Sequence, residues 1–147
     1  MELIIKDFYQ LTNDELYDIL KLRVEVFVVE QNCPYQDIDD YDKQAIHVYY
    51  KENGKIQAYI RVFPENVTYE EASIGRVISI KRRCGLGTQI MKVGINLIKD
   101  RFKSNKIKIG AQLYAREFYG NLGFVQSSDV YIEDGIPHIK MILDLKN

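Results

Sequence analysis

The sequence has few cysteines, no long apolar run and no excess of basic residues. Two cysteines, Cys33 and Cys84, cannot form a disulfide framework, so we expect a reducing compartment and a cytoplasmic protein. No apolar stretch approaches the length of a membrane span, and the first ten residues lack a signal-peptide core with a small-residue cleavage site. The net charge of −1 argues against a general nucleic-acid binder. What remains is a chain of 147 residues, for which one domain over residues 1–147 is expected.

Residues 72–101 form the most informative stretch, predicted to be a strand, a basic loop with glycines and a helix. Residues 72–80 are apolar and β-branched, as in a buried strand. Three cations, Lys81 to Arg83, precede Gly85 and Gly87. Apolar residues then recur at helical spacing: Leu86, Ile90, Val93, Leu97 and Ile98.

This stretch predicts a phosphate-binding loop. The first N–H groups of a helix lack intrahelical partners, the helix dipole is positive there, and glycines let a ligand approach the backbone. A plain strand-to-helix turn is the alternative. The loop is not a Walker A motif, because no Gly-Lys-Ser/Thr follows, nor a dinucleotide fingerprint, because the third glycine is missing.

The rest of the chain predicts a mixed α/β (α+β) sheet with helices on its faces, in the order β-α-β-β-β-α-β-α-β-β. A capping box, Thr12 with Glu15, begins a helix that reaches about Val29. Asn53-Gly54 is a strong hairpin signal, and Gly123 should end a short helix over residues 115–121. Further strands are expected at residues 2–8, 45–50, 56–63, 106–113, 125–132 and 136–145.

Several motifs resemble those of the GCN5-related N-acetyltransferase (GNAT) superfamily. The pattern Arg82-x-x-Gly85-x-Gly87 after a hydrophobic strand resembles its Arg/Gln-x-x-Gly-x-Gly/Ala signature, and the segment FYGNLGF at residues 118–124 resembles its second signature. Residues 22–39 and 133–141 resemble the ElaA-like branch, and the element order matches that fold along the whole chain. The loop from Ser79 to Arg82 is about two residues shorter than is usual in the family.

The resemblance implies an N-acetyltransferase that moves the acetyl group of acetyl-coenzyme A directly to a primary amine of a small molecule or peptide, without a metal. It implies that the pantetheine arm pairs with the backbone of β-strand residues Val77, Ile78 and Ser79, where one N–H polarises the thioester carbonyl. The pyrophosphate would lie on the N–H groups after that strand, with Arg82 closing the loop. Those groups belong to Arg83, Cys84, Gly85, Leu86, Gly87 and Thr88.

Tyr119 is the catalytic candidate that the resemblance implies, because the tyrosine of this segment donates its proton as the coenzyme thiolate leaves. A core tyrosine, one of 11 in the chain, is the alternative. The base that deprotonates the amine stays open among several residues: Glu30, Asp37, Asp39, His47, Glu70 and Glu71. His47 lies in a predicted strand, where a structural histidine is expected.

The acidic loop over residues 30–43 is expected on the acceptor side of the resembled fold. It could attract a cationic amine, or it is a solvated turn with Tyr35 and Ile38 packed inward. A calcium loop is excluded, because the glycine and glutamate that such a loop needs are missing. The substrate-binding candidates are Glu30, Tyr35, Asp37, Asp39 and His138.

A second class of function stays open, a catalytically silent acyl-coenzyme A binding module that keeps the loop without the acceptor chemistry. The full segment around Tyr119 favours the enzyme. Both cysteines are expected to be structural, since direct transfer needs no covalent intermediate. The last hairpin leaves edge strands that could pair in a homodimer, so a monomer or a homodimer is expected.

Overall fold

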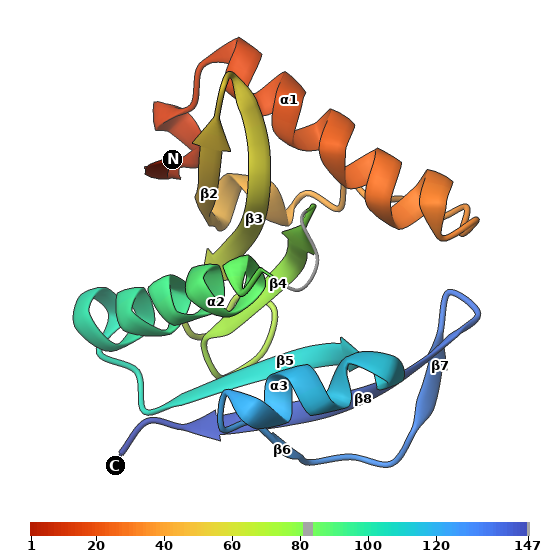
Figure 1. Ribbon diagram of the computed structural model, residues 1–147. Coiled ribbons are helices and arrows are strands. Elements are labelled where there is room, and N and C mark those ends of the chain that lie inside the picture. Colours follow the sequence, from red (N-terminus) through yellow and green to blue (C-terminus); the bar gives the residue numbers. More distant parts are fainter. Residues whose placement is uncertain (81–83, 147) are drawn as a thin grey trace.

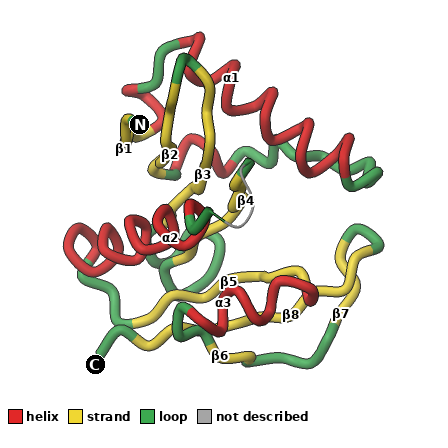
Figure 2. The backbone as a smooth tube through the Cα atoms, viewed as in Figure 1, coloured by secondary structure: helices red, strands yellow, loops and turns green. Residues whose placement is uncertain are grey.

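The computed structural model describes residues 1–80 and 84–146, which form two half-sheets with helices packed on them (Figures 1 and 2). The expected contacts of Arg82 and Arg83 with the coenzyme pyrophosphate, and most of the shortened loop, therefore lie outside the described residues. No helix in the two described ranges is long and apolar enough to cross a membrane.

The first half-sheet is antiparallel and contains four strands in chain order. They are β1 (Glu2–Asp7), β2 (Ile46–Glu52), β3 (Lys55–Phe63) and β4 (Ser73–Ser79). The predicted hairpin at Asn53-Gly54 is confirmed: it joins β2 to β3, with φ values of 51° and 75°. These positive angles are what such two-residue turns require.

Two helices cover opposite faces of this half-sheet. Helix α1 (Asn13–Val24) has the predicted capping box between Thr12 and Glu15 and continues as a wider turn over Glu25–Glu30, which confirms its expected length. Helix α2 (Leu86–Leu97) continues as a similar turn over Ile98–Phe102. Side chains of α1 pack on Tyr49 and Tyr59, whereas those of α2 pack on the alternate residues of the same strands.

The second half-sheet is built on β8 (Ile136–Asp144). One edge of β8 pairs with β5 (Lys106–Gln112), and the other pairs with β6 (Val125–Gln126) and β7 (Tyr131–Glu133). Between β5 and β6, a short turn (Leu113–Ala115) leads into α3 (Arg116–Asn121), which lies against this half-sheet (Figure 1). Gly123, with a φ of 101°, follows the end of α3 as predicted.

The single strand expected over residues 125–132 is wrong, because the chain forms β6 and β7 with a loop between them. In that loop the Ser128 hydroxyl accepts the backbone N–H of Lys140 at 2.8 Å. A serine side chain that takes the place of a backbone carbonyl interrupts the ladder, and this competition is a known property of serine.

The two half-sheets are joined by one parallel bridge, between Ala72 and Ile107. There the Lys108 N–H donates to the Ala72 carbonyl at 2.9 Å. Beyond this bridge β4 and β5 separate, and Figure 1 shows them diverging from their shared start. The divergence produces the cavity that forms the candidate site.

Candidate functional site

Strand β4 contains a bulge on the side of the cavity. Tyr59 pairs with Ile78 and Arg61 pairs with Gly75, so the single residue Ile60 of β3 faces both Arg76 and Val77. Arg76 has a φ of 50°, in the left-handed region that a non-glycine residue rarely adopts. A bulge releases a backbone group from the ladder and bends the strand. Here the released backbone lies beside the space between the two half-sheets.

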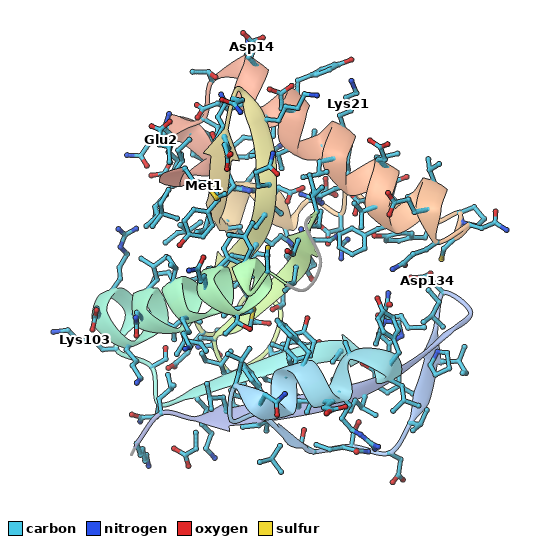
Figure 3. The ribbon with its side chains drawn as sticks, viewed as in Figure 1. Met1, Glu2, Asp14, Lys21, Lys103 and Asp134 are labelled. Carbon is cyan, nitrogen blue, oxygen red and sulfur yellow. The ribbon has the colours of Figure 1, made fainter. Side chains whose placement is uncertain are left out.

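The β4–β5 cavity has a volume of about 170 Å³ and is lined by parts of the chain that are distant in sequence. Residues 74–77 of β4 form one wall, and Ile109, Gly110 and Gln112 of β5 form the other. The α1–β2 loop, the start of α3 and the β7–β8 turn complete it. Figure 3 shows Asp134, in that turn, pointing toward the segment after α1, and the Cys33 thiol donates to the Asp134 carbonyl at 3.2 Å.

Tyr119 lies on the wall of this cavity, on α3. Its ring packs edge-on against Phe118 and Phe124, with centroid distances of 5.0 and 6.0 Å. Its hydroxyl makes no hydrogen bond to the described residues. Burial, with a smaller contribution from Tyr114, raises the pKa of Tyr119 above its ordinary value, so the hydroxyl keeps its proton at neutral pH.

The start of α2 lies between β4 and α3. Gly85 precedes the helix with a φ of 77° and provides no side-chain cap, so the first N–H groups of α2 gain no partner from this residue. A β-carbon at Gly87 would lie 3.4 Å from the Phe118 ring and 3.6 Å from Ser79. The expected coenzyme-binding residues Val77, Ser79 and Gly87 thus come together beside α3, while Cys84 is exposed.

Three carboxylates of the acidic loop are not free to bind a cation, because arginines bind Asp37, Asp39 and Asp42, whereas Glu30 and Asp40 are exposed. Arg23 donates to Asp37 at 3.0 Å and to Asp42 at 2.6 Å. Arg61 donates to Asp39 at 2.5 Å and to Asp42 at 3.0 Å. Arg76 donates to Asp37 at 2.8 Å and to Asp39 at 3.3 Å. We call these six residues the Arg–Asp network.

The Arg–Asp network keeps its carboxylates ionised. Burial alone would raise the pKa of Asp39, but hydrogen bonds and charge from Arg61 and Arg76 outweigh it and lower that pKa to about 2. Arg23 and Arg61 likewise lower the pKa of Asp42 against the effect of burial. Its three positive and three negative groups compensate one another, so the network itself presents no net charge to a ligand.

The predicted acceptor residues therefore divide into two groups. Tyr35 and His138 line the β4–β5 cavity. Asp37 and Asp39 instead hold arginines, and Glu30 is exposed outside the lining, so the attraction of an amine by these carboxylates is not supported by their contacts. The alternative, a solvated turn with Tyr35 and Ile38 packed inward, is wrong in part. Tyr35 is partly buried and its hydroxyl donates to Asp37 at 2.8 Å, but Ile38 is 47% exposed.

The two histidines have different surroundings. His47 is fully buried, and its ring nitrogens lie 2.7 Å from the Tyr59 hydroxyl and 2.9 Å from the Asp42 carbonyl, which confirms a structural histidine. His138 Nδ1 lies 2.7 Å from the Ile136 carbonyl. A carbonyl can only accept, so Nδ1 carries the proton and the neutral ring leaves Nε2 unprotonated.

Three cavity residues were missed from the sequence. Arg76 had a visible signal, a lone cation inside an apolar strand, but the strand pattern concealed the bulge. Gln31 and Gln112 had none: their carboxamides pair at 3.2 and 3.4 Å although 81 residues separate them.

The fold places this protein among the acyl-coenzyme A N-acyltransferases. It resembles the crystal structure of an acyl-CoA N-acyltransferase from Pseudomonas aeruginosa, with a TM-score of 0.91, 36% identity, and coverage of 97% of this chain and 99% of the other. It also resembles the crystal structure of Escherichia coli ElaA, with a TM-score of 0.90, 36% identity, and coverage of 97% and 99%.

Sequence comparison identifies the family. The acetyltransferase (GNAT) domain family matches residues 13–145. A UPF0039 protein of Schizosaccharomyces pombe is 40% identical over 149 residues, covering 99% of this chain and 98% of the relative. Protein ElaA of Escherichia coli is 39% identical over 136 residues, covering 90% and 89%. The chain therefore belongs to the GNAT family, in its ElaA-like branch, and is an acyltransferase that uses an acyl-coenzyme A as co-substrate.

Proposed function

We propose that this protein is an N-acetyltransferase that transfers the acetyl group of acetyl-coenzyme A directly to a primary amine of a small molecule or peptide, in a ternary complex. The observation that supports this most is the β4–β5 cavity, with a backbone bulge on one wall and, on another, the Tyr119 hydroxyl, which makes no hydrogen bond within residues 1–80 and 84–146.

The donor would enter between the two half-sheets. Its pantetheine arm carries amides that would pair with the edge of β4 that faces β5, at Val77 to Ser79, in the manner of an added strand. The pyrophosphate would lie at the uncapped start of α2, on the N–H groups of residues 83–88, with Arg82 closing the loop. This arrangement directs the thioester to the bulge.

A backbone N–H of the bulge, at Arg76 or Val77, would then donate to the thioester carbonyl. Negative charge grows on that oxygen as the amine attacks, and one fixed donor of this kind lowers the barrier by about 3–4 kcal/mol. The ion pairs of Arg76 with Asp37 and Asp39 hold the bulge in place, which gives these carboxylates a supporting role.

Tyr119 would stabilise the departing thiolate. The departing thiolate, whose conjugate thiol has a pKa near 8.5, is a weaker base than tyrosinate. Complete proton transfer from the tyrosine to the sulfur is therefore unfavourable. A strong hydrogen bond from the protonated hydroxyl to the sulfur is sufficient, and its raised pKa keeps that proton available.

His138 is the base that the geometry supports best. It lines the cavity, and its Nε2 is unprotonated when the ring is neutral, since Nδ1 donates to the Ile136 carbonyl. Glu133, whose carboxylate lies 3.7 Å from Nε2, would stabilise the ring once it has accepted the proton. His47 has no free nitrogen for this role.

The test is coenzyme release from acetyl-coenzyme A across a panel of primary amines. Tyr119→Phe should lower kcat about 100-fold or more, the usual contribution of a positioned acid, with little change in the KM for either substrate. Tyr17→Phe is the matched control, because Tyr17 is 69% exposed on α1 and lies outside the cavity lining. Cys33→Ser should keep its activity if transfer is direct.

The alternative is the silent binding module. Tight binding of acetyl-coenzyme A, with no amine-stimulated release by the wild-type protein for any amine of the panel, would favour it. Unchanged kcat in Tyr119→Phe would contradict the role of that residue while leaving the enzyme class intact.

A further inference from the structure

A group of polar side chains gathers next to the β4–β5 cavity, on the face of β8 that also carries His138. Lys140 of β8 donates to the Tyr69 hydroxyl at 2.9 Å. Its ammonium also lies 4.7 Å from the centroid of the Tyr131 ring and 4.9 Å from that of the Tyr69 ring. Two aromatic rings from different segments thus flank one cation.

These groups converge on a single point above Gly110, a residue of the cavity wall. A β-carbon placed on Gly110 would lie 3.1 Å from the Tyr69 hydroxyl, 3.3 Å from the Tyr131 hydroxyl and 3.4 Å from Lys140 Nζ. Any side chain here would crowd all three polar atoms. Glycine therefore lets the three polar atoms meet over this point of the cavity wall.

The group has unused capacity to donate hydrogen bonds. The Tyr131 hydroxyl is buried without a hydrogen-bond partner among the described residues, and burying such a group costs about 1–3 kcal/mol. Lys140 forms no ion pair with a described carboxylate, which contrasts with the arginines of the Arg–Asp network, each of which pairs with two carboxylates. Lys108, 5.4 Å from the Tyr69 ring centroid, adds a second positive charge.

The positive charge of Lys140 persists at neutral pH. Burial alone would lower its pKa, but the neighbouring tyrosine hydroxyls raise it above the ordinary value. An ammonium with spare N–H groups, next to an unpaired phenol, is complementary to an oxyanion.

We propose that Lys140, Tyr69 and Tyr131 bind a carboxylate of the acceptor, so that the substrate is an amine that also carries a carboxylate, such as an amino acid. This inference rests on the proposed function for the reacting amine. Tyr131 connects the two sites, since its ring stacks on His138 with a centroid distance of 5.8 Å and an angle of 25°. His138 and Lys140, two residues apart on β8, face the same side about 7 Å apart, which suits an amine and a carboxylate joined by a short chain.

The anion site can be tested without turnover, by titrating acetate into ¹⁵N-labelled protein and following the Gly110 amide by NMR. The resonance is assigned by its loss in Gly110→Ala. Acetate should shift it saturably and acetamide should not. Lys140→Gln should weaken binding about 10- to 100-fold, the range for a hydrogen bond to a charged group, and Tyr131→Phe should weaken it less. Lys106→Gln, on the exposed part of β5, is the matched control.

Three results would overturn the site: no saturable shift, an equal shift with acetamide, or unchanged binding in Lys140→Gln. Tighter binding of inorganic phosphate than of acetate would overturn the assignment to carboxylates.

A kinetic comparison separates this inference from the proposed function. The kcat/KM for an amino acid is compared with that for its carboxamide, and the wild-type protein should prefer the amino acid. The ratio of these two kcat/KM values should fall about 10- to 100-fold in Lys140→Gln but not in Lys106→Gln. An unchanged ratio during normal turnover refutes the carboxylate site as part of the acceptor site. Acetate binding without any amine-dependent release refutes the proposed acetyl transfer and leaves the anion site standing.

Discussion

Asp37→Asn should destabilise the protein strongly, because it removes a buried charge on which two arginines depend. The Asp37 side chain is only 2% exposed. Its carboxylate accepts hydrogen bonds from Arg23 at 3.0 Å, from Arg76 at 2.8 Å and from the Tyr35 hydroxyl at 2.8 Å. Asparagine has the same shape but no charge, and it turns an N–H₂ group toward at least one donor.

The size of this loss of stability follows from Arg23, whose side chain is fully buried. Removing one partner of a buried ion pair typically costs about 3–5 kcal/mol, because the other charge stays buried without compensation. Arg23 keeps Asp42 as a partner at 2.6 Å, so the lower end of that range, about 3 kcal/mol, is expected. For a domain of this size, that loss corresponds to a fall in Tm of roughly 6–12 °C.

Urea denaturation followed by far-UV circular dichroism measures this loss, with equal m-values as the condition for comparison. Asp40→Asn is the matched control, because Asp40 is exposed, has no side-chain bond to a described residue, and has a φ of 70° that asparagine tolerates well. If the two variants lose equal stability, the Arg–Asp network does not stabilise the fold as argued. If Asp37→Asn keeps its stability but raises the KM for amines, the carboxylate binds the acceptor after all.

Two further predictions concern packing and acidity. Gly94→Ala should cost about 1–3 kcal/mol of stability, because its β-carbon would lie 2.6 Å from the Ile60 Cδ1 atom. Gly120→Ala, whose β-carbon would have nothing within 4 Å, should be neutral or stabilising in the same urea assay. Equal effects of the two substitutions would show that α2 can move away from the sheet. Glu15→Gln should lose up to about 3 kcal/mol above pH 5, since hydrogen bonds from Lys6 and other groups outweigh burial and lower the pKa of Glu15 from 4.5 to about 2. Because that pKa is depressed on folding, the difference between wild type and variant should shrink as the pH falls from 4.5 toward 2, and a gap that is independent of pH would contradict the charge as its cause.

Local signals were sufficient for much of the fold. The capping box at Thr12, the turn at Asn53-Gly54 and the stop at Gly123 each depend on the conformation of a few neighbouring residues, and each lies where the sequence predicted it. The alternation of apolar residues gave the order of strands and helices for the same reason.

The sequence did not reveal contacts between distant segments. Arg23 and Asp42 are 19 residues apart, and Arg76 and Asp37 are 39 apart, so neither pair leaves a periodic pattern. The acidic loop was consequently interpreted from its composition, as charge available to a substrate or to water. Only the fold brings three arginines under it.

The separation of β4 from β5 has a consequence for the open edges of the sheet. Two strands with open edges are normally templates on which another chain can add a strand and start aggregation. Here both edges line one cavity of about 170 Å³ instead of lying at the outer rim of a sheet. The ion-paired Arg76 bulge also bends the edge of β4 away from a regular template. Both features make these two inner edges poorer templates for an added strand than a flat, regular edge would be.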